Sequence, residues 1–438
     1  MRQISWLLLG IPLLVQAQNR DSVKFEKVSS WEEVLSAARN QNKYIFVDCF
    51  ATWCAPCKAM EQEVYDKNQV ASFMNDKFIS IQIQMDSTDH DDSSTKKWLW
   101  EARTIASDFN IQSYPTYLFF TPSGEIVHKG HGYKSYGDFI SLAKNALDTN
   151  SQYYTLIRKY RSGFLDFPSM AKLAYMAKDM RDMDLANKVG HDYLFQNLYK
   201  LCDSELLAKE NIEFITNFIK SSNERGFDFF YRHRRQIDSV MNGTLYVTSF
   251  SQYVIDFIIS VEEVYSNLFK NLDTYHLEFK NPVENPNWKR MSGAIKRKYN
   301  DECAKRIILD AKLKWYEYAK CWPEYCKTVV IKVKKYGPYG LFSVDSKLNQ
   351  NAFDIFLHSN NKKYLNLALR WSNNSIKMSK ENVNPEYYDT YANLLYKLGR
   401  KREAIYYEEK AASLALNARD IQENLNKMRQ NKPTWPSN

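Results

Sequence analysis

The chain has 438 residues, enough for two or three domains, and a net charge of +9 at pH 7. The basic excess is uneven: residues 18–150 carry 14 Lys and Arg against 18 Asp and Glu, whereas residues 151–438 carry 45 against 33. Neither a basic block nor a nucleic-acid-binding motif accompanies it, so we predict a solvated helical surface and no nucleic-acid partner. Contact with acidic partners or a membrane surface is the alternative. Seven cysteines are too few for a disulfide scaffold in a chain of this length.

The first 17 residues have the composition of a signal peptide. Arg2 precedes an apolar run of about ten residues, which is too short to cross a bilayer. Val15 and Ala17 place small residues where a signal peptidase reads, which predicts cleavage after Ala17. A buried N-terminal helix is the alternative, but the flanking residues fit a signal better. We therefore expect an exported protein, periplasmic or extracellular, with no integral membrane segment.

Helix-like and strand-like segments alternate through residues 18–150. Ser30 and Glu33 have the spacing of a capping box, and Val34 and Ala38 then lie on one helical face. Residues 78–85 alternate apolar and polar side chains as a strand does. The predicted elements in order are a helix from Trp31, strand 44–50, a helix from Cys54 broken near Asn68, strand 78–85, helix 95–109, strand 114–120, a turn at 121–124, strand 125–128 and helix 135–147.

Cys54 and Cys57 stand two residues apart at the predicted turn between strand 44–50 and the following helix. Free N–H groups and the positive end of the helix dipole favour a thiolate there, and Pro56 suits the first turn. This spacing serves either thiol–disulfide exchange or half of a zinc site. No second Cys or His pair lies nearby, so we predict a redox pair with no metal and no other cofactor.

Around this pair the sequence resembles the thioredoxin family, over about residues 20–147. The resemblance implies an α/β thioredoxin fold, a central mixed sheet flanked by helices, for residues 18–150. The segment from Asp86 to Asn110 resembles exported thioredoxin-like proteins with an enlarged central helix. The matching residues are Asp48, six positions before Cys54, the segment Phe50 to Lys58, Tyr114-Pro115-Thr116 and Ser123-Gly124-Glu125.

The resemblance also implies roles for single residues. Cys54, exposed at the helix start, would attack a partner disulfide, and Cys57 would resolve the mixed disulfide. Asp48 would be a buried acid that accepts the proton of Cys57. Packing alone is the alternative reading for Trp53 and Asp48. The residues implied in substrate binding are Trp53, Tyr114 and Pro115, the last of these cis in the family.

Two departures from the family pattern bear on the chemistry. Gln82 stands where thioredoxins usually have a lysine facing the buried acid, so Asp48 should stay protonated more easily. Ala55 and Pro56 separate the cysteines, whereas strong oxidants and isomerases of the superfamily place a histidine there. Without that imidazole the thiolate is less stabilised, which favours a reductant over an oxidant.

Residues 151–438 carry no catalytic motif and have helical spacing, which predicts an all-α, repeat-like domain. Residues 383–416 resemble one tetratricopeptide repeat, although Glu408 stands where an aromatic residue is commoner. One repeat cannot bury its core alone, so the preceding helices should complete a solenoid-like stack. The domain would bind a protein partner or serve as architecture. The small residues that carry the resemblance are Ala392, Gly399, Ala404 and Ala411.

The remaining cysteines and histidines carry weaker predictions. Cys49 should be a buried apolar side chain. His128 and His131 are expected to be surface histidines rather than metal ligands. Two pairings of the later cysteines stay open in an oxidising compartment, Cys321–Cys326 across the bend at Pro323 and Cys202–Cys303.

These patterns predict an exported thiol–disulfide oxidoreductase that reduces protein disulfides through Cys54 and Cys57. Its partners would be protein substrates with disulfides, an unidentified electron donor, and a protein bound to the helical domain. One alternative is a non-catalytic helical-repeat interaction protein whose thioredoxin-like domain grips polypeptide. Another is a disulfide oxidase or isomerase that uses the same cysteines.

Overall fold

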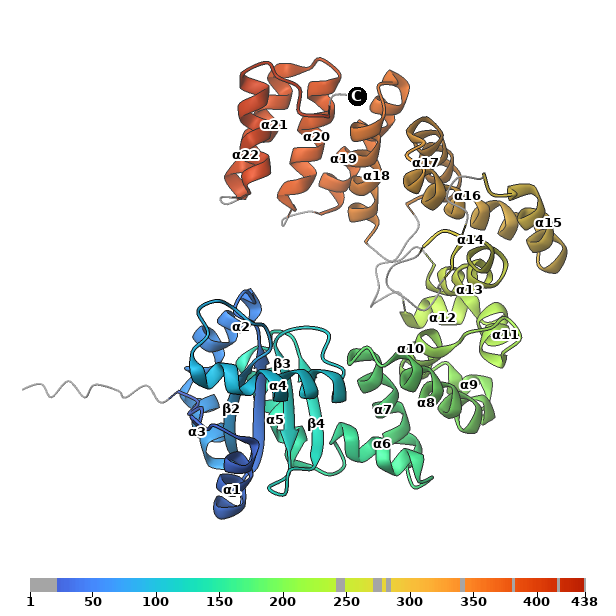
Figure 1. The fold of residues 1–438 in the computed structure, drawn as a ribbon. Helices are drawn as coiled ribbons and strands as arrows, with labels where there is room; N and C mark the ends of the chain where they lie inside the picture. Colours follow the sequence, from blue (N-terminus) through green and yellow to red (C-terminus); the bar gives the residue numbers. More distant parts are fainter. Residues whose placement is uncertain are drawn as a thin grey trace, which may run out of the picture. The chain divides into compact units, whose positions relative to one another are not determined.

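The computed structural model describes residues 22–241, 249–270, 278–280, 285–338, 343–379, 383–415 and 418–436. The predicted signal peptide, residues 1–17, lies outside the described residues. The chain divides into two compact units, Met1–Tyr193 and Leu194–Asn438. The first contains the sheet and the second is built from helices (Figure 1).

The first unit is organised around a four-stranded mixed sheet with strand order β2-β1-β3-β4. β1 pairs parallel with β2 and antiparallel with β3, and β3 pairs antiparallel with β4. The predicted strands and the mixed sheet are thereby confirmed. The strands are β1 (Tyr44–Phe50), β2 (Phe78–Gln84), β3 (Thr116–Phe120) and β4 (Ile126–His131).

Helices cover both faces of this sheet. Ser30 caps the first helix by accepting the N–H of Glu33, as its capping-box spacing predicts. The predicted break near Asn68 is present, because a short π-helical turn, η1, ends before α3 begins there. The helices are α1 (Trp31–Gln41), α2 (Ala55–Met60), η1 (Glu61–Tyr65), α3 (Asn68–Lys77), α4 (Ser93–Asp108) and α5 (Tyr136–Leu147).

Each face of the sheet has its own hydrophobic core. Phe46 packs with Met60 and Phe139 on the face covered by α2 and α5, whereas Ile45 and Val47 pack on the opposite face. Because side chains alternate along a strand, the side chain two residues after Phe46 points under α2. That residue is Asp48, the predicted buried acid.

Two more helices and most of a third belong to the first unit, and α6 packs on the edge strand β4. His128, expected on the surface, is only 2% exposed, so that prediction was wrong. Its Nδ1 accepts the backbone N–H of Tyr153 at 3.0 Å, which joins β4 to the start of α6. A covered edge cannot pair with another chain. The helices are α6 (Tyr153–Arg161), α7 (Phe167–Asp179) and α8 (Met183–Gln196).

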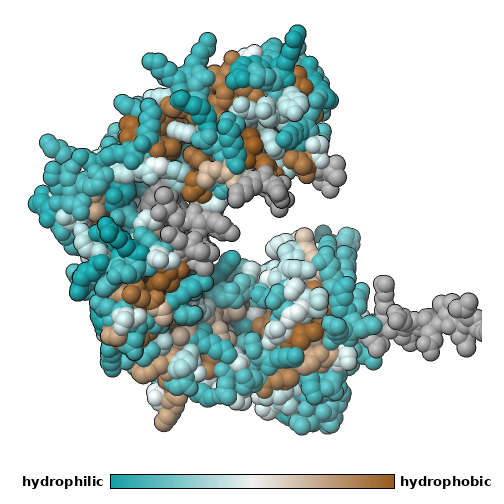
Figure 2. Space-filling model, turned by 180° about the vertical axis from the view of Figure 1, so that it is seen from behind, coloured by the Kyte–Doolittle hydropathy of each residue, from teal (hydrophilic) through white to brown (hydrophobic). Residues whose placement is uncertain are grey.

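The second unit confirms the predicted helix-rich region. The visible surface in Figure 2 is mainly hydrophilic with smaller apolar patches. No helix in the described part of the chain is both long and apolar enough to cross a bilayer. Its helices are η2 (Leu198–Lys200), α9 (Asp203–Leu206), α10 (Lys209–Phe218), α11 (Arg225–Arg232), α12 (Arg234–Met241), α13 (Phe250–Ser260), η3 (Val261–Tyr265), α14 (Ser266–Leu268), α15 (Trp288–Lys298), α16 (Asp301–Tyr318), α17 (Trp322–Tyr336), α18 (Val344–His358), α19 (Lys362–Met378), α20 (Pro385–Lys397), α21 (Lys401–Leu414) and α22 (Arg419–Arg429).

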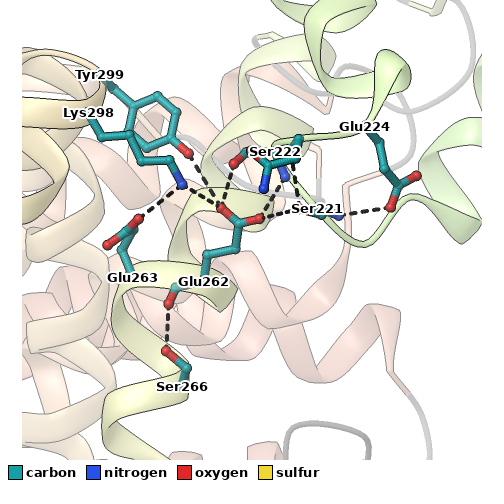
Figure 3. A network of polar contacts seen from close by, with 9 residues as sticks. Ser221, Ser222, Glu224, Glu262, Glu263, Ser266, Lys298 and Tyr299 are labelled. Atoms are coloured by element: carbon teal, nitrogen blue, oxygen red, sulfur yellow. Dashed lines mark hydrogen bonds and ion pairs between the residues drawn. The ribbon is translucent and has the colours of Figure 1, made fainter.

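A polar network around Glu262 joins three segments of this unit (Figure 3). The carboxylate of Glu262, in η3, accepts the backbone N–H of Ser222 at 2.7 Å and the Ser221 hydroxyl at 2.9 Å. Lys298, in α15, donates to Glu262 and to Glu263, each at 3.2 Å. The network therefore fixes the loop before α11 and the end of α15 against η3.

α20 and α21 form the helix pair expected from the repeat-like stretch. Ala392, Ala404 and Ala411 are fully buried, and Gly399 adopts a positive φ of 85° in the turn between the helices. Small residues let two helices approach closely, which agrees with the pattern. Assignment to the tetratricopeptide class stays a prediction.

The open cysteine pairings are not formed in this structure. Cys321 precedes α17 and Cys326 lies within that helix, and both are free thiols. Cys202 is exposed and Cys303 is buried, and these are also free. The disulfide of the chain therefore lies in the first unit.

Candidate redox site

Cys54 and Cys57 form a disulfide at the start of α2. Cys54 is the N-cap of this helix, and its Sγ accepts the backbone N–H of Cys57 at 3.1 Å. Pro56 lies in the first helical turn, as predicted. After reduction the same N–H and the helix dipole would stabilise a thiolate on Cys54.

The two cysteines are about equally buried. Cys54 is 2% exposed and Cys57 is 5% exposed, so the expectation of an exposed Cys54 was wrong. The reason is local packing, because Ala51 and the partly buried Tyr114 lie against the pair. The exposed aromatic side chain next to Cys54 is Trp53, with 70% of its surface accessible.

The structure brings the three predicted substrate-binding residues together. The Tyr114–Pro115 peptide bond is cis, as the resemblance implied. The rings of Trp53 and Tyr114 lie edge to face with centroids 5.9 Å apart. The carbonyl of Pro115 accepts the N–H of Gly132 at 2.8 Å, which fixes this loop to the end of β4. An aromatic surface therefore adjoins the disulfide.

Asp48 is buried below α2 and lies opposite Gln82 in the register of β1 and β2, as expected. Gln82 Nε2 donates to Asp48 Oδ2 at 3.3 Å, whereas Oδ1 has no hydrogen bond within the described residues. Burial raises the pKa of Asp48 to about 7, against the opposing effects of Gln82 and Tyr65. A carboxyl group with this pKa can exchange a proton near neutral pH.

Sequence reasoning missed two neighbours of Asp48, namely Glu61 and Tyr65. Gln82 Nε2 also donates to Glu61 Oε1, at 3.1 Å, so one amide joins a buried carboxyl group to an exposed one. The negative charge of Glu61 contributes to the raised pKa of Asp48. Both residues belong to the π-helical turn η1, and such turns are frequent at functional sites. A π-turn has no clear sequence signal, so helical periodicity did not find them.

Asp86 also belongs to this site, and the sequence assigned it no role. Its Oδ1 accepts the N–H of Thr52 at 3.0 Å, and its Oδ2 accepts the Thr52 hydroxyl. The carbonyl of Phe50 accepts the N–H of Met85 at 2.8 Å. These contacts hold the turn that carries Trp53 and Cys54 against the end of β2.

Comparison with known proteins shows which family the domain around this site resembles. Residues 31–147 match the family model for a thioredoxin-like domain. These residues therefore form a thioredoxin-like domain with a Cys54–Cys57 pair. Within the described residues no group of three or more His, Cys, Asp or Glu side chains could hold a metal ion.

Individual relatives match this part only. The thiol:disulfide interchange protein DsbD of Pseudoalteromonas atlantica is 30% identical over 131 residues, which are 28% of this chain and 20% of DsbD. Thioredoxin H3 of Arabidopsis thaliana is 28% identical over 99 residues, 23% of this chain and 68% of that protein. Among solved structures, thioredoxin F from spinach chloroplast is 22% identical with a TM-score of 0.22, covering 29% of this chain and 96% of that chain. The chain thus spans about a fifth of the length of the DsbD proteins it matches.

Proposed function

We propose that this protein is an exported thiol–disulfide oxidoreductase that reduces disulfides in other proteins. The observation that carries the proposal is the Cys54–Cys57 disulfide at a helix N-terminus, beside the cis Tyr114–Pro115 bond. A pure binding protein needs neither sulfur. The similarity to thiol:disulfide interchange proteins and thioredoxins supports the same chemistry.

The first step of the reduction is attack by the Cys54 thiolate on one sulfur of a substrate disulfide. A mixed disulfide forms between Cys54 and that sulfur, and the other substrate sulfur leaves as a thiolate and takes a proton from water. Trp53 and Tyr114 supply an aromatic surface for the substrate segment next to the sulfurs. This step needs Cys54 alone.

The second step releases the substrate. Cys57 gives its proton to the Asp48 carboxylate and attacks Cys54 Sγ, which restores the Cys54–Cys57 disulfide. The second substrate sulfur leaves as a thiolate and takes a proton from water, and Asp48 returns its proton to the solvent. Two electrons have then passed from the protein to the substrate. A separate dithiol donor must return two electrons and two protons before the next cycle.

The residues between the cysteines favour the reductant direction. A more stable thiolate makes a disulfide more oxidising, and Ala55 offers no imidazole to stabilise Cys54. The acidic residues Asp48 and Glu61 oppose a further negative charge in the same region. We therefore expect a reduction potential nearer to about −270 mV than to about −120 mV. A potential at the oxidising end would assign the protein as an oxidase or isomerase instead.

Export is the part of the proposal that rests on residues 1–17. Their composition predicts a cleavable signal, which places the dithiol in an oxidising compartment. Mass spectrometry of the protein recovered from the producing cell should give an N-terminus at Gln18. An intact Met1 in the cytosolic fraction would contradict export and leave the redox chemistry untouched.

The test of the chemistry uses the purified full-length protein with insulin as substrate and dithiothreitol as donor. The wild type should accelerate insulin reduction, Cys54→Ala should abolish the acceleration, and Cys57→Ser should accumulate mixed disulfides through Cys54. Cys202→Ser is the matched control, since Cys202 is exposed but distant in sequence from the pair. Equal rates for wild type and Cys54→Ala would refute the enzymatic proposal.

A further inference from the structure

The second unit contains a cavity of about 390 Å³ between helices α13, α16, α17 and α18. This volume lies within the range of small-molecule sites in proteins, about 300–1,000 Å³. Much of its wall is aromatic or aliphatic, and Phe257 remains half exposed there. The apolar lining comprises Tyr253, Phe257, Tyr265, Leu313, Tyr325 and Val329.

Asn351 is a polar side chain of this cavity without a hydrogen-bond partner among the described residues. Asn351, in α18, is only 7% exposed and lines the cavity, yet its amide forms no hydrogen bond within the described residues. By contrast, the neighbouring buried Asn349 donates to the Thr390 hydroxyl at 3.1 Å. The amide atoms of Asn351 are not fully enclosed by protein, so they face the open space of the cavity. The Asn351 amide is therefore available to a ligand.

Lys347 stands one helical turn before Asn351 and lines the same cavity. It is half-buried and has no ion pair or side-chain hydrogen bond among the described residues. Burial, followed by the charge of Lys332, lowers the pKa of Lys347 despite nearby carboxylates. An anion beside Lys347 would stabilise the charged form of the lysine and offset the effect of burial.

Most of the other charged residues of the cavity already contact a partner within the protein. Asp310 is ion-paired with Lys332 at 2.5 Å, and Asp354 accepts the Tyr325 hydroxyl at 2.8 Å. Lys314 lies 4.7 Å from the centre of the Tyr265 ring. Asp256 is held by Arg306, and Glu317 is solvent-exposed. Because carboxylates already line this cavity, a monoanion is favoured over a phosphate dianion.

We propose that this cavity binds a small organic carboxylate with an apolar or aromatic body. The Lys347 ammonium and the Asn351 amide would hold the carboxylate, and Phe257, Tyr265 and Val329 would contact the body. The donors are one turn apart on one helix, so they face the same side. This function is separate from the redox chemistry and does not depend on it.

The test is calorimetric titration of the full-length protein with 3-phenylpropionate, and with its neutral analogue 3-phenylpropionamide. The carboxylate should bind at least about tenfold more tightly than the amide, the size expected for a hydrogen bond to a charged group. Lys347→Gln and Asn351→Leu should each weaken binding about tenfold. Lys363→Gln, an exposed lysine of α19, is the matched control and should leave affinity unchanged.

Thermal unfolding keeps the test independent of folding defects. Asn351→Leu replaces an amide that forms no hydrogen bond within the described residues, so its melting temperature without ligand should stay close to that of the wild type while binding falls. Inorganic phosphate should not compete. The proposal is overturned if 3-phenylpropionate does not bind, if the neutral amide binds equally well, or if folded Lys347→Gln and Asn351→Leu bind like the wild type.

Discussion

At the scale of single residues, the redox site is governed by the electrostatics of Asp48. Its carboxyl group is buried below α2, and burial raises its pKa to about 7. In the unfolded chain the same group titrates near its ordinary value of 3.8. Between these two values the native state holds a proton that the unfolded state does not. Stability contributed by this residue is therefore lost as the pH rises from about 4 to about 7.

Asp48→Asn should raise the stability of the protein at pH 8 and leave it unchanged near pH 4. The expected gain is about 2–4 kcal/mol, since a shift of about three pKa units is worth at most about 4 kcal/mol. Urea unfolding at pH 8 and at pH 4 measures this gain in the free energy of unfolding. The same variant should slow insulin reduction, because Cys57 loses its proton acceptor. An equal stability change at both pH values would contradict the raised pKa.

Glu61→Gln should lower the pKa of Asp48, because it removes a negative charge that contributes to the raised pKa. Titration of the Asp48 carboxyl carbon by NMR measures this pKa directly. Glu63→Gln is the matched control, since Glu63 lies on the same π-turn but accepts the Tyr133 hydroxyl at 2.8 Å. An Asp48 pKa that moves equally in both variants would argue against a specific Glu61–Gln82–Asp48 connection.

At the scale of elements, the contact between β4 and α6 depends on a buried neutral histidine. His128 accepts the N–H of Tyr153, and burial lowers its pKa to about 4. Protonation would occupy the acceptor nitrogen and place a charge in the core. Stability contributed by neutral His128 is thus lost as the pH falls from about 6.5 to about 4. Asp48 acts in the opposite direction over much of this window.

The opposing effects of Asp48 and His128 on stability can be separated with a double variant. In the Asp48→Asn background, stability should fall by up to about 3 kcal/mol between pH 7 and pH 4, because the effect of His128 is no longer offset. Adding His128→Gln should remove most of this fall. Urea unfolding over the pH range provides the measurement. A pH dependence that persists in the double variant would place it on another group.

The pair α20 and α21 contains another buried acid. Glu408 is fully buried beside Asp389, and burial together with the charge and the side chain of Asp389 raises its pKa to about 10. Glu408→Leu should stabilise the protein by about 1–3 kcal/mol at pH 7, because it removes the desolvation cost of a buried carboxyl group. Glu409→Leu, on the exposed neighbouring position, should give no gain. The urea concentrations at which the two variants are half unfolded, compared with that of the wild type, measure these changes in stability.

At the scale of the whole molecule, the seven cysteines divide into one disulfide and five free thiols. A thiol-reactive dye should therefore count five thiols in the oxidised, denatured protein and seven after reduction. Without denaturant Cys202 should react first, because it is the exposed member of the free set. A count of three or fewer would show that further pairs, such as Cys321–Cys326, form in solution.

The sequence by itself determined the redox domain and its principal residues. The redox motif depends on features that are close together in the sequence. These are the two residues between the cysteines, the preceding strand and the proline in the first helical turn. The cis Tyr114–Pro115 bond and the position of Gln82 opposite Asp48 were predicted from the family resemblance instead. The helical character of the second part followed from periodicity.

Other features were decided only by the tertiary structure, because they depend on groups distant in sequence. Cys54 is buried by Tyr114, which is sixty positions away, and His128 is buried by α6. The π-turn that brings Glu61 to Gln82 has no sequence signal. The cavity beside Asn351 exists because four helices leave a space, and no single helix encodes it. Burial and long-range contact, rather than residue type, set the chemistry of these groups.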